Sequence, residues 1–234
     1  MAASREHVIP NSWYPDTTPS DLERWTVPSH RKCNSSLSAN EEYVFRKLAA
    51  VTDPDEPAAA GIWNRAFKGM KSSAGRNPKD KKIREAVHRK FMASTVPVAQ
   101  ASQEMLKAAK RGLTNHDPAR MLVQFDPDRL HAVISKIIRC ISYKINDAPA
   151  PANAKVLQRM VGMEEFAVEK GQLFSSGQLH YLGDGLIINH GQLEERGLHA
   201  ELVTVLLWKS IVINSIIHWD MPGKFELADP LFLD

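Results

Sequence analysis

Cysteine is scarce in this sequence, since its 234 residues contain only Cys33 and Cys140. Two cysteines in a chain of this length cannot form the disulfide framework that stabilises small secreted domains. The first residues, Met1 to Glu6, contain no apolar segment of the kind found in a secretory signal. We therefore expect a soluble protein in a reducing compartment, the cytoplasm.

Long apolar runs are also missing. The most apolar stretch, residues 202–219, is interrupted by Lys209, Asn214 and Ser215. A membrane-spanning helix needs about 20 consecutive, mostly apolar residues, so no membrane partner is expected. The hydrophobic content of 43% and the charged content of 24% are those of an ordinary globular protein. The chain is long enough for one large or two small domains.

A strong overall charge is absent too, because the formal net charge is only +3. The charges are unevenly distributed, however. Residues 61–111 contain thirteen lysines and arginines against three acids, whereas residues 181–234 contain eight acids against three bases. A basic middle and an acidic end are typical of a protein with one anion-facing surface.

The first fifty residues predict two short strands followed by helix. Residues 5–9 and 23–28 are strand-like, and each run is closed by a proline. A helical turn is expected at 34–37. The capping-box pattern Ser38-Ala39-Asn40-Glu41 then predicts a helix at about 39–50.

The middle of the chain is predicted to be helical. Residues 53–61 are interpreted as a linker and 71–82 as a flexible loop, because both contain proline and polar residues. Short helices are expected at 62–70, 83–93 and 100–113. The strongest helix prediction starts at Asp126-Pro127-Asp128, an acidic cap with proline in the first turn, and extends to about residue 146.

From about residue 172 the pattern favours strands. Runs rich in leucine, isoleucine and valine occur at 173–174, 178–182, 186–189, 202–208 and 211–219. A helix over 200–217 is the alternative, and the β-branched residues favour strands over it. The whole predicts an α+β protein with a first module at 1–52 and a second part at 53–234, helical and basic in its middle and strand-rich at its C-terminal end.

Two segments in the first forty residues carry chemistry. They are Glu6-His7-Val8-Ile9-Pro10 and His30-Arg31-Lys32-Cys33-Asn34. Cleavage of a phosphodiester needs a base for the attacking water and a positive charge beside the leaving oxygen. Histidine suits the first task near neutral pH, and Mg²⁺ held by oxygen ligands suits the second. His7 could be the base, and Glu6 and Asn34 could be metal ligands, although neighbours on a strand point to opposite faces.

The same two segments resemble the HNH endonucleases, in particular those with an acid-His-Val-Ile-Pro segment followed by Cys-x-x-Cys-Asn. The resemblance covers about the first fifty residues. It implies a ββα-metal fold, with His7 as the general base and with Glu6 and Asn34 as ligands of Mg²⁺ or a similar divalent ion. It also implies a nucleic-acid substrate, for which we expect DNA; the choice between DNA and RNA and the oligomeric state stay open.

Many HNH relatives carry a Cys-x-x-Cys before the acid-His segment, which completes a structural zinc site with the later pair. Here the later pair is His30 and Cys33, which is half of a tetrahedral site. Either this chain has no structural Zn²⁺, or the protein begins upstream of Met1 and the remaining ligands lie there. We favour the second interpretation.

Basic residues in the middle of the chain are candidate phosphate contacts. The predicted nucleic-acid-binding residues are Lys79, Lys81, Lys82, Arg84 and Arg89. A solvated basic face without a ligand is the alternative interpretation. For the whole chain, the hypotheses are a metal-dependent endonuclease, a non-catalytic nucleic-acid- or protein-binding module derived from one, and an interaction protein whose C-terminal strands pair with another subunit.

Overall fold

The computed structural model combines helices and strands, which confirms the predicted α+β class. The structure describes residues 3–103, 105, 121–162, 177–195 and 198–219. Its elements are β1 (Ala3–His7), η1 (Asn11–Trp13), β2 (Thr26–His30), α1 (Arg31–Ser36), α2 (Ser38–Ala50), η2 (Pro57–Ala59), α3 (Ile62–Lys68), η3 (Ser72–Ala74), α4 (Pro78–Met92), β3 (Thr95–Pro97), η4 (Val98–Gln100), β4 (Met121–Val123), α6 (Pro127–Asn146), β5 (Lys155–Gly162), β6 (Gln178–Tyr181), β7 (Leu186–Glu195), β8 (Leu198–Leu207) and β9 (Ile211–Trp219).

The N-terminal strands β1 and β2 pair antiparallel, with Glu6 opposite Val27 and His7 opposite Thr26. Helices α1 and α2 follow β2 directly, as the sequence predicted. The predicted bounds are wrong in three places: β1 ends at His7 rather than at Ile9, Pro28 lies inside β2 rather than ending it, and α1 begins at Arg31 rather than at Asn34. Proline lacks the N–H that a central strand must donate, and a two-stranded ribbon tolerates it because one edge of each strand is free.

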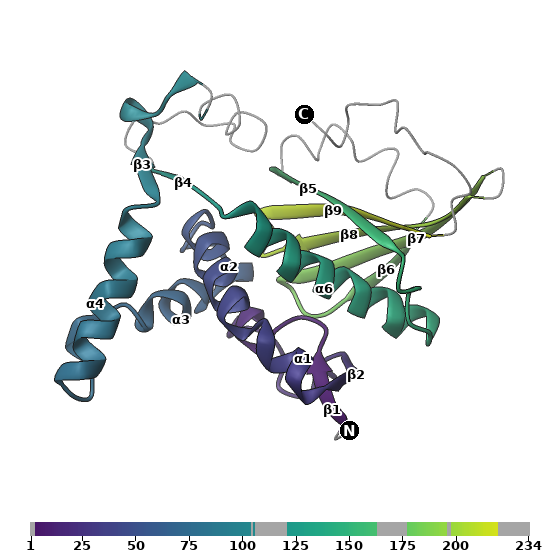
Figure 1. Cartoon of the computed structure of the whole chain (residues 1–234), viewed down its shortest axis with the longest axis horizontal. Coiled ribbons are helices and arrows are strands. Elements are labelled where there is room, and N and C mark those ends of the chain that lie inside the picture. Colours follow the sequence, from purple (N-terminus) through teal and green to yellow (C-terminus); the bar gives the residue numbers. More distant parts are fainter. Residues whose placement is uncertain (1–2, 104, 106–120, 163–176, 196–197, 220–234) are drawn as a thin grey trace.

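Helix α6 is the central helix and begins where the sequence predicted. The carboxylate of Asp126 accepts hydrogen bonds from the backbone N–H groups of Asp128 and Arg129, both at 3.1 Å. One side of α6 packs against the large sheet, and α2 packs against α6 (Figure 1). Its fully buried apolar residues are Val133, Ile134, Ile137, Ile138 and Ile141.

The large sheet has five antiparallel strands in the order β5-β9-β8-β7-β6. Residues 198–207 and 211–219 are strands, so the strand prediction is confirmed and the helical alternative is wrong. Strand β5 was not predicted. Its residues show no clear apolar alternation, and it becomes a strand by pairing with β9, from Lys155 opposite His218 to Gly162 opposite Ile211.

Helix α4 corrects the loop predicted at 71–82. It begins at Pro78, and the side chain of Asn77 caps it by accepting a hydrogen bond from Asp80 N at 2.8 Å. Proline was interpreted as a sign of a loop, but Pro78 after Asn77 is favourable at the first position of a helix whose N-cap is asparagine. The predictions at 173–174 and over most of 100–113 lie outside the described residues.

The N-terminal elements and the large sheet share one hydrophobic cluster, which includes residues on both sides of the predicted boundary at 52/53. Trp208 is fully buried, its ring centroid lies 6.2 Å from that of Trp13, and its indole N–H donates to the Trp13 carbonyl at 2.8 Å. The turn between β8 and β9 is thereby attached to the N-terminal segment. Within the part of the chain that the structure describes, no helix is long and apolar enough to cross a membrane.

Candidate functional site

His7 is the last residue of β1 and is half-buried. Its Nδ1 is shielded from solvent and has no hydrogen-bond partner among the described residues. A neutral imidazole carries one nitrogen that accepts a hydrogen bond or a proton. Nδ1 of His7 is therefore a buried polar atom without a partner, so the ring could act as a general base only through its other nitrogen, Nε2.

Glu6 precedes His7 on β1, and its side chain is directed to the interior. The carboxylate is 9% exposed, and its Oε1 lies 2.5 Å from Nζ of Lys136 on α6. The same ammonium group forms an ion pair with Glu41 on α2. Because neighbouring residues on a strand point to opposite faces, the Glu6 and His7 side chains diverge, as the sequence predicted.

The charge of Lys136 is maintained by its two partners. Burial by itself lowers the pKa of Lys136, but the hydrogen bonds with Glu41 and Glu6 outweigh burial and raise it. Lys136 is thus a permanent cation between two carboxylates. One turn further along α6, burial raises the pKa of the Cys140 thiol to about 11, so this cysteine stays a neutral packing residue.

Asn34 is attached to β1 through its side chain. Its Nδ2 donates to the backbone carbonyl of Arg5 at 3.4 Å, and its Oδ1 makes no hydrogen bond with any residue the structure describes. The amide oxygen of Asn34 is a donor that suits Mg²⁺, whereas an imidazole such as that of His7 suits Zn²⁺ or Ni²⁺ better. Glu6 as it stands does not fit, because its carboxylate is already neutralised by Lys136 and a metal there would have to displace the ammonium group.

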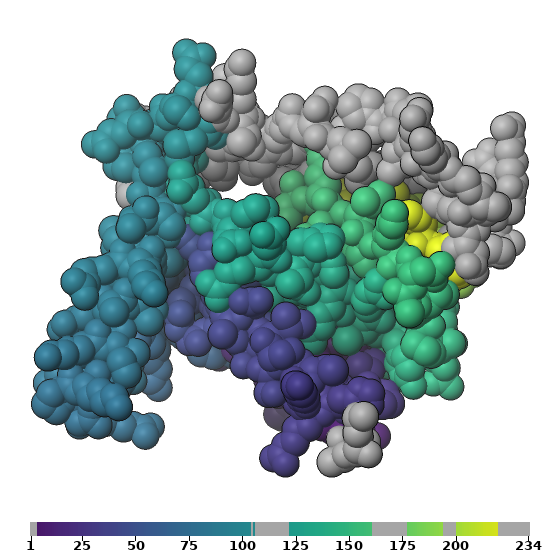
Figure 2. All heavy atoms as spheres, in the orientation of Figure 1, coloured from purple at the N-terminus to yellow at the C-terminus, as the bar shows by residue number. Residues whose placement is uncertain are grey.

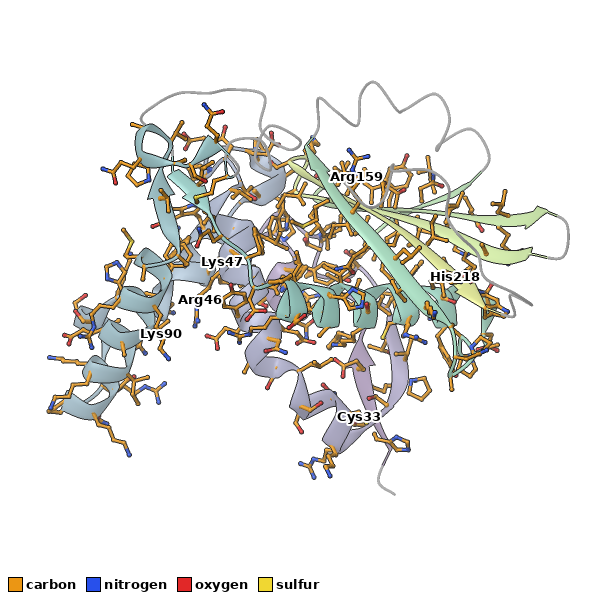
Figure 3. The ribbon with its side chains drawn as sticks, turned by 45° about the horizontal axis from the view of Figure 1, so that its top comes forward. Cys33, Arg46, Lys47, Lys90, Arg159 and His218 are labelled. Atoms are coloured by element: carbon orange, nitrogen blue, oxygen red, sulfur yellow. The ribbon has the colours of Figure 1, made fainter. Side chains whose placement is uncertain are left out.

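The proposed half zinc site lies at the junction of β2 and α1. His30 ends β2, and Cys33 lies on α1, where Figure 3 labels it. Both residues are exposed. Structural zinc requires four protein ligands. Among the described residues no group of three or more histidine, cysteine, aspartate or glutamate side chains is arranged to hold a metal. Structural zinc therefore stays a prediction.

The predicted nucleic-acid-binding residues all lie on α4, but they divide into two kinds. Lys79, Lys81, Lys82 and Arg89 are exposed. Arg84 is engaged with the protein itself, because its Nε lies 3.0 Å from Asp80 Oδ1 and its Nη1 donates to the Lys68 carbonyl at 3.0 Å.

Asp80 strengthens this attachment of α4. Hydrogen bonds from the Arg76 backbone N–H and from the Arg84 guanidinium hold the pKa of its carboxyl below the usual range. Arg84 thus fastens α4 to the end of α3 and is not available in the same way as the four exposed residues.

Sequence reasoning missed two buried lysines, Lys136 and Lys47. Lys47 is 1% exposed, its Nζ is hydrogen-bonded to Ser94 Oγ and lies 4.9 Å from the centre of the Phe91 ring, and burial lowers its pKa to about 8. Figure 3 labels it on α2. A signal was present in both cases, because each lysine lies on the apolar stripe of its helix.

The chain was compared with protein-family models, with curated proteins and with solved structures, and nothing in any of the three matched it.

Proposed function

We propose that this chain is a cytoplasmic, metal-dependent endonuclease of the HNH type that hydrolyses phosphodiester bonds of DNA. One observation carries the proposal. The order of two antiparallel strands followed directly by a helix is that of a ββα-metal module, and the Asn34 side chain on α1 is hydrogen-bonded back to β1 next to Glu6 and His7. Asn34 thus lies beside the strand that carries Glu6 and His7.

Each residue has a distinct role in this proposal. His7 takes a proton from the attacking water through Nε2 of its imidazole, because Nδ1 is shielded from solvent. Asn34 holds α1 against β1 through its amide N–H, and its oxygen is directed away from that bond. A divalent cation such as Mg²⁺, when bound, would stabilise the charge on the leaving oxygen. Asn34 offers an oxygen donor for it, and Glu6 could be a second ligand only if it exchanges Lys136 for the metal.

The exposed cations of α4 would supply affinity for the substrate. Contacts between lysine or arginine and phosphate groups release counterions, so binding weakens steeply as the salt concentration rises. These contacts are independent of sequence, and they position the nucleic acid without selecting bases.

The test is cleavage of a supercoiled plasmid with Mg²⁺, Mn²⁺ or Ni²⁺, with EDTA as the metal-free control. We expect His7→Ala to lower the rate by roughly 10²- to 10⁴-fold, the range that a general base contributes. His131→Ala is the matched control, because His131 is an exposed histidine on α6. Undiminished cleavage by His7→Ala would rule out the role of His7.

A second candidate function is a binding module that derives from an HNH nuclease and no longer cuts. The ion pair between Lys136 and Glu6 favours it, because it removes the one carboxylate of the motif from the metal. This candidate predicts salt-sensitive binding of DNA by the wild-type chain and no cleavage with any of the three metals. Metal-dependent nicking that is lost in His7→Ala would exclude it.

A further inference from the structure

Helix α4 projects from one side of the molecule (Figures 1 and 2). None of its residues is fully buried. It is attached along one side only. Val87 and Phe91 pack against the hydrophobic core, and the Phe91 ring meets the Phe67 ring edge-on at 5.3 Å. Arg84 on the same side is bonded to Asp80 and to the end of α3. The opposite side of the helix is left uncovered by the described residues.

The exposed cations are sorted around the helix. Lys79 and Lys82 line one shallow hollow together with Pro78, Ile83 and Ala86. At about 100° per residue, Arg89 and Lys90 continue this same side one turn beyond Ala86. We call this set the outer face of α4: Lys79, Lys82, Ile83, Ala86, Arg89 and Lys90.

Lys81 is an exposed lysine of α4 that does not belong to the outer face. The helical period places it on a different side from Lys79 and Lys82, and its side chain starts close to Gly75. The outer face therefore has four cations, and Ile83 is 54% exposed at its centre. The exposed Glu85 lies at its edge, one turn before Arg89.

The chemistry of the outer face fits duplex DNA. Its four cations complement a polyanion, and the major groove of B-DNA is wide enough to admit an α-helix. The 15 residues of α4 span about 22 Å. Single-strand binding depends on aromatic rings that stack on bases, and the outer face presents none, because Phe91 is engaged in the core. Duplex RNA has a deep, narrow major groove that side chains do not read.

We propose that the outer face of α4 lies in the major groove of duplex DNA, with Lys79, Lys82, Arg89 and Lys90 against phosphates and Ile83 against base edges. This inference rests on the proposed nucleic-acid function and specifies its substrate as duplex DNA. It also divides the basic residues of α4, because Lys81 and Arg84 lie outside the contact.

The test is fluorescence anisotropy of the full chain with a labelled 30-base-pair DNA duplex, one of its single strands and an RNA duplex, in EDTA and over a series of salt concentrations. The wild type should bind the DNA duplex at least tenfold more tightly than the other two. Lys82→Ala and Lys81→Ala are the matched pair, since they remove adjacent exposed lysines from different sides of one helix. Lys82→Ala should reduce the magnitude of the slope of log association constant against log salt concentration by about one. Lys81→Ala should leave this slope unchanged.

Equal effects of Lys81→Ala and Lys82→Ala would overturn the proposal, as would equal affinity for DNA duplex and either other ligand. Circular dichroism of both variants separates loss of folding from loss of contact. Binding in EDTA is independent of cleavage, so duplex binding by a chain that never cuts would remove the nuclease and retain the groove contact. If Lys82→Ala leaves both cleavage and DNA binding unchanged, the groove contact is ruled out and the nuclease function is retained.

Discussion

Nζ of Lys136 on α6 lies 2.5 Å from Oε1 of Glu6 on β1, although 130 residues separate the two in the chain. The same ammonium group binds Glu41 on α2, so one cation joins three elements of the fold. The strand that carries His7 is thereby held against the central helix. Any function of His7 depends on this buried contact as much as on the histidine itself.

Lys136→Met should lower the free energy of unfolding by about 3–5 kcal/mol, because it leaves two largely buried carboxylates without their cation. Urea unfolding followed by circular dichroism measures the loss. Lys144→Met, which removes an exposed lysine from the same helix, should change stability by less than about 0.5 kcal/mol. Adding Glu6→Gln and Glu41→Gln to Lys136→Met should restore much of the loss. A triple variant as unstable as the single one would show that the ion pairs are not its cause.

The buried Lys47 should make stability depend on pH in the alkaline range. Burial lowers its pKa to about 8 in the folded protein, against about 10.5 in the unfolded chain. Between these values the unfolded chain binds more protons, so this group makes the free energy of unfolding rise with pH from about 8 to about 10.5. Below about pH 8 the charge is present in both states, and its full burial cost opposes folding.

Lys47→Met removes this pH dependence. The free energy of unfolding of the wild type and of the variant is measured by urea unfolding at pH 7.5, 9 and 10, and the two are compared at each pH. The variant should be at least as stable as the wild type at pH 7.5, and its advantage should shrink by pH 10. Lys71→Met, at an exposed position, should give a difference that is constant over the same pH range. Parallel curves for wild type and Lys47→Met would contradict a lowered pKa.

Two substitutions at Asn34 separate its amide nitrogen from its amide oxygen. Asn34→Asp keeps an oxygen donor but loses the N–H that donates to Arg5 O, whereas Asn34→Ala loses both. If the oxygen binds the cation, Asn34→Asp should retain metal-dependent cleavage and Asn34→Ala should lose most of it. If Asn34 serves only to attach α1 to β1, both variants should lose activity alike. Plasmid nicking with Mg²⁺ and EDTA makes the distinction.

The turn between β8 and β9 offers a stabilising substitution. Three residues lie between β8 and β9. The first two, Trp208 and Lys209, both have φ of 52°, and Ser210 N donates to Leu207 O at 3.0 Å. The left-handed region costs a residue other than glycine roughly 1–2 kcal/mol. Lys209→Gly should therefore raise the free energy of unfolding by about 1 kcal/mol.

Lys209→Ala is the control for the turn, since alanine keeps the Cβ atom that strains a left-handed residue. It should leave the stability within about 0.5 kcal/mol of the wild type. Equal gains from glycine and alanine would mean that the backbone at Lys209 is not strained. The same change is not open to Trp208, whose ring packs against Trp13 and Phe45 in the core.

Much of the secondary structure could be predicted from sequence alone, because its signals are local. The Asp126 cap and the apolar spacing of α6 lie within about twenty residues, and the prediction of α6 is confirmed from end to end. The divergence of Glu6 and His7 follows from the period of a strand in the same way. Where a local signal had two meanings, as at Asn77-Pro78, the prediction of a loop was wrong.

Tertiary structure decided what local patterns do not contain. β5 becomes a strand because β9 offers it a hydrogen-bonding edge, and Glu6 faces a lysine rather than a metal because α6 passes beside β1. A buried charge needs a counter-charge, and the sequence does not show which of thirty lysines and arginines supplies it. The sequence by itself determined the motif, the capped helices and the basic middle of the chain. Packing of segments more than a hundred residues apart determined which side chains of the motif remain uncommitted.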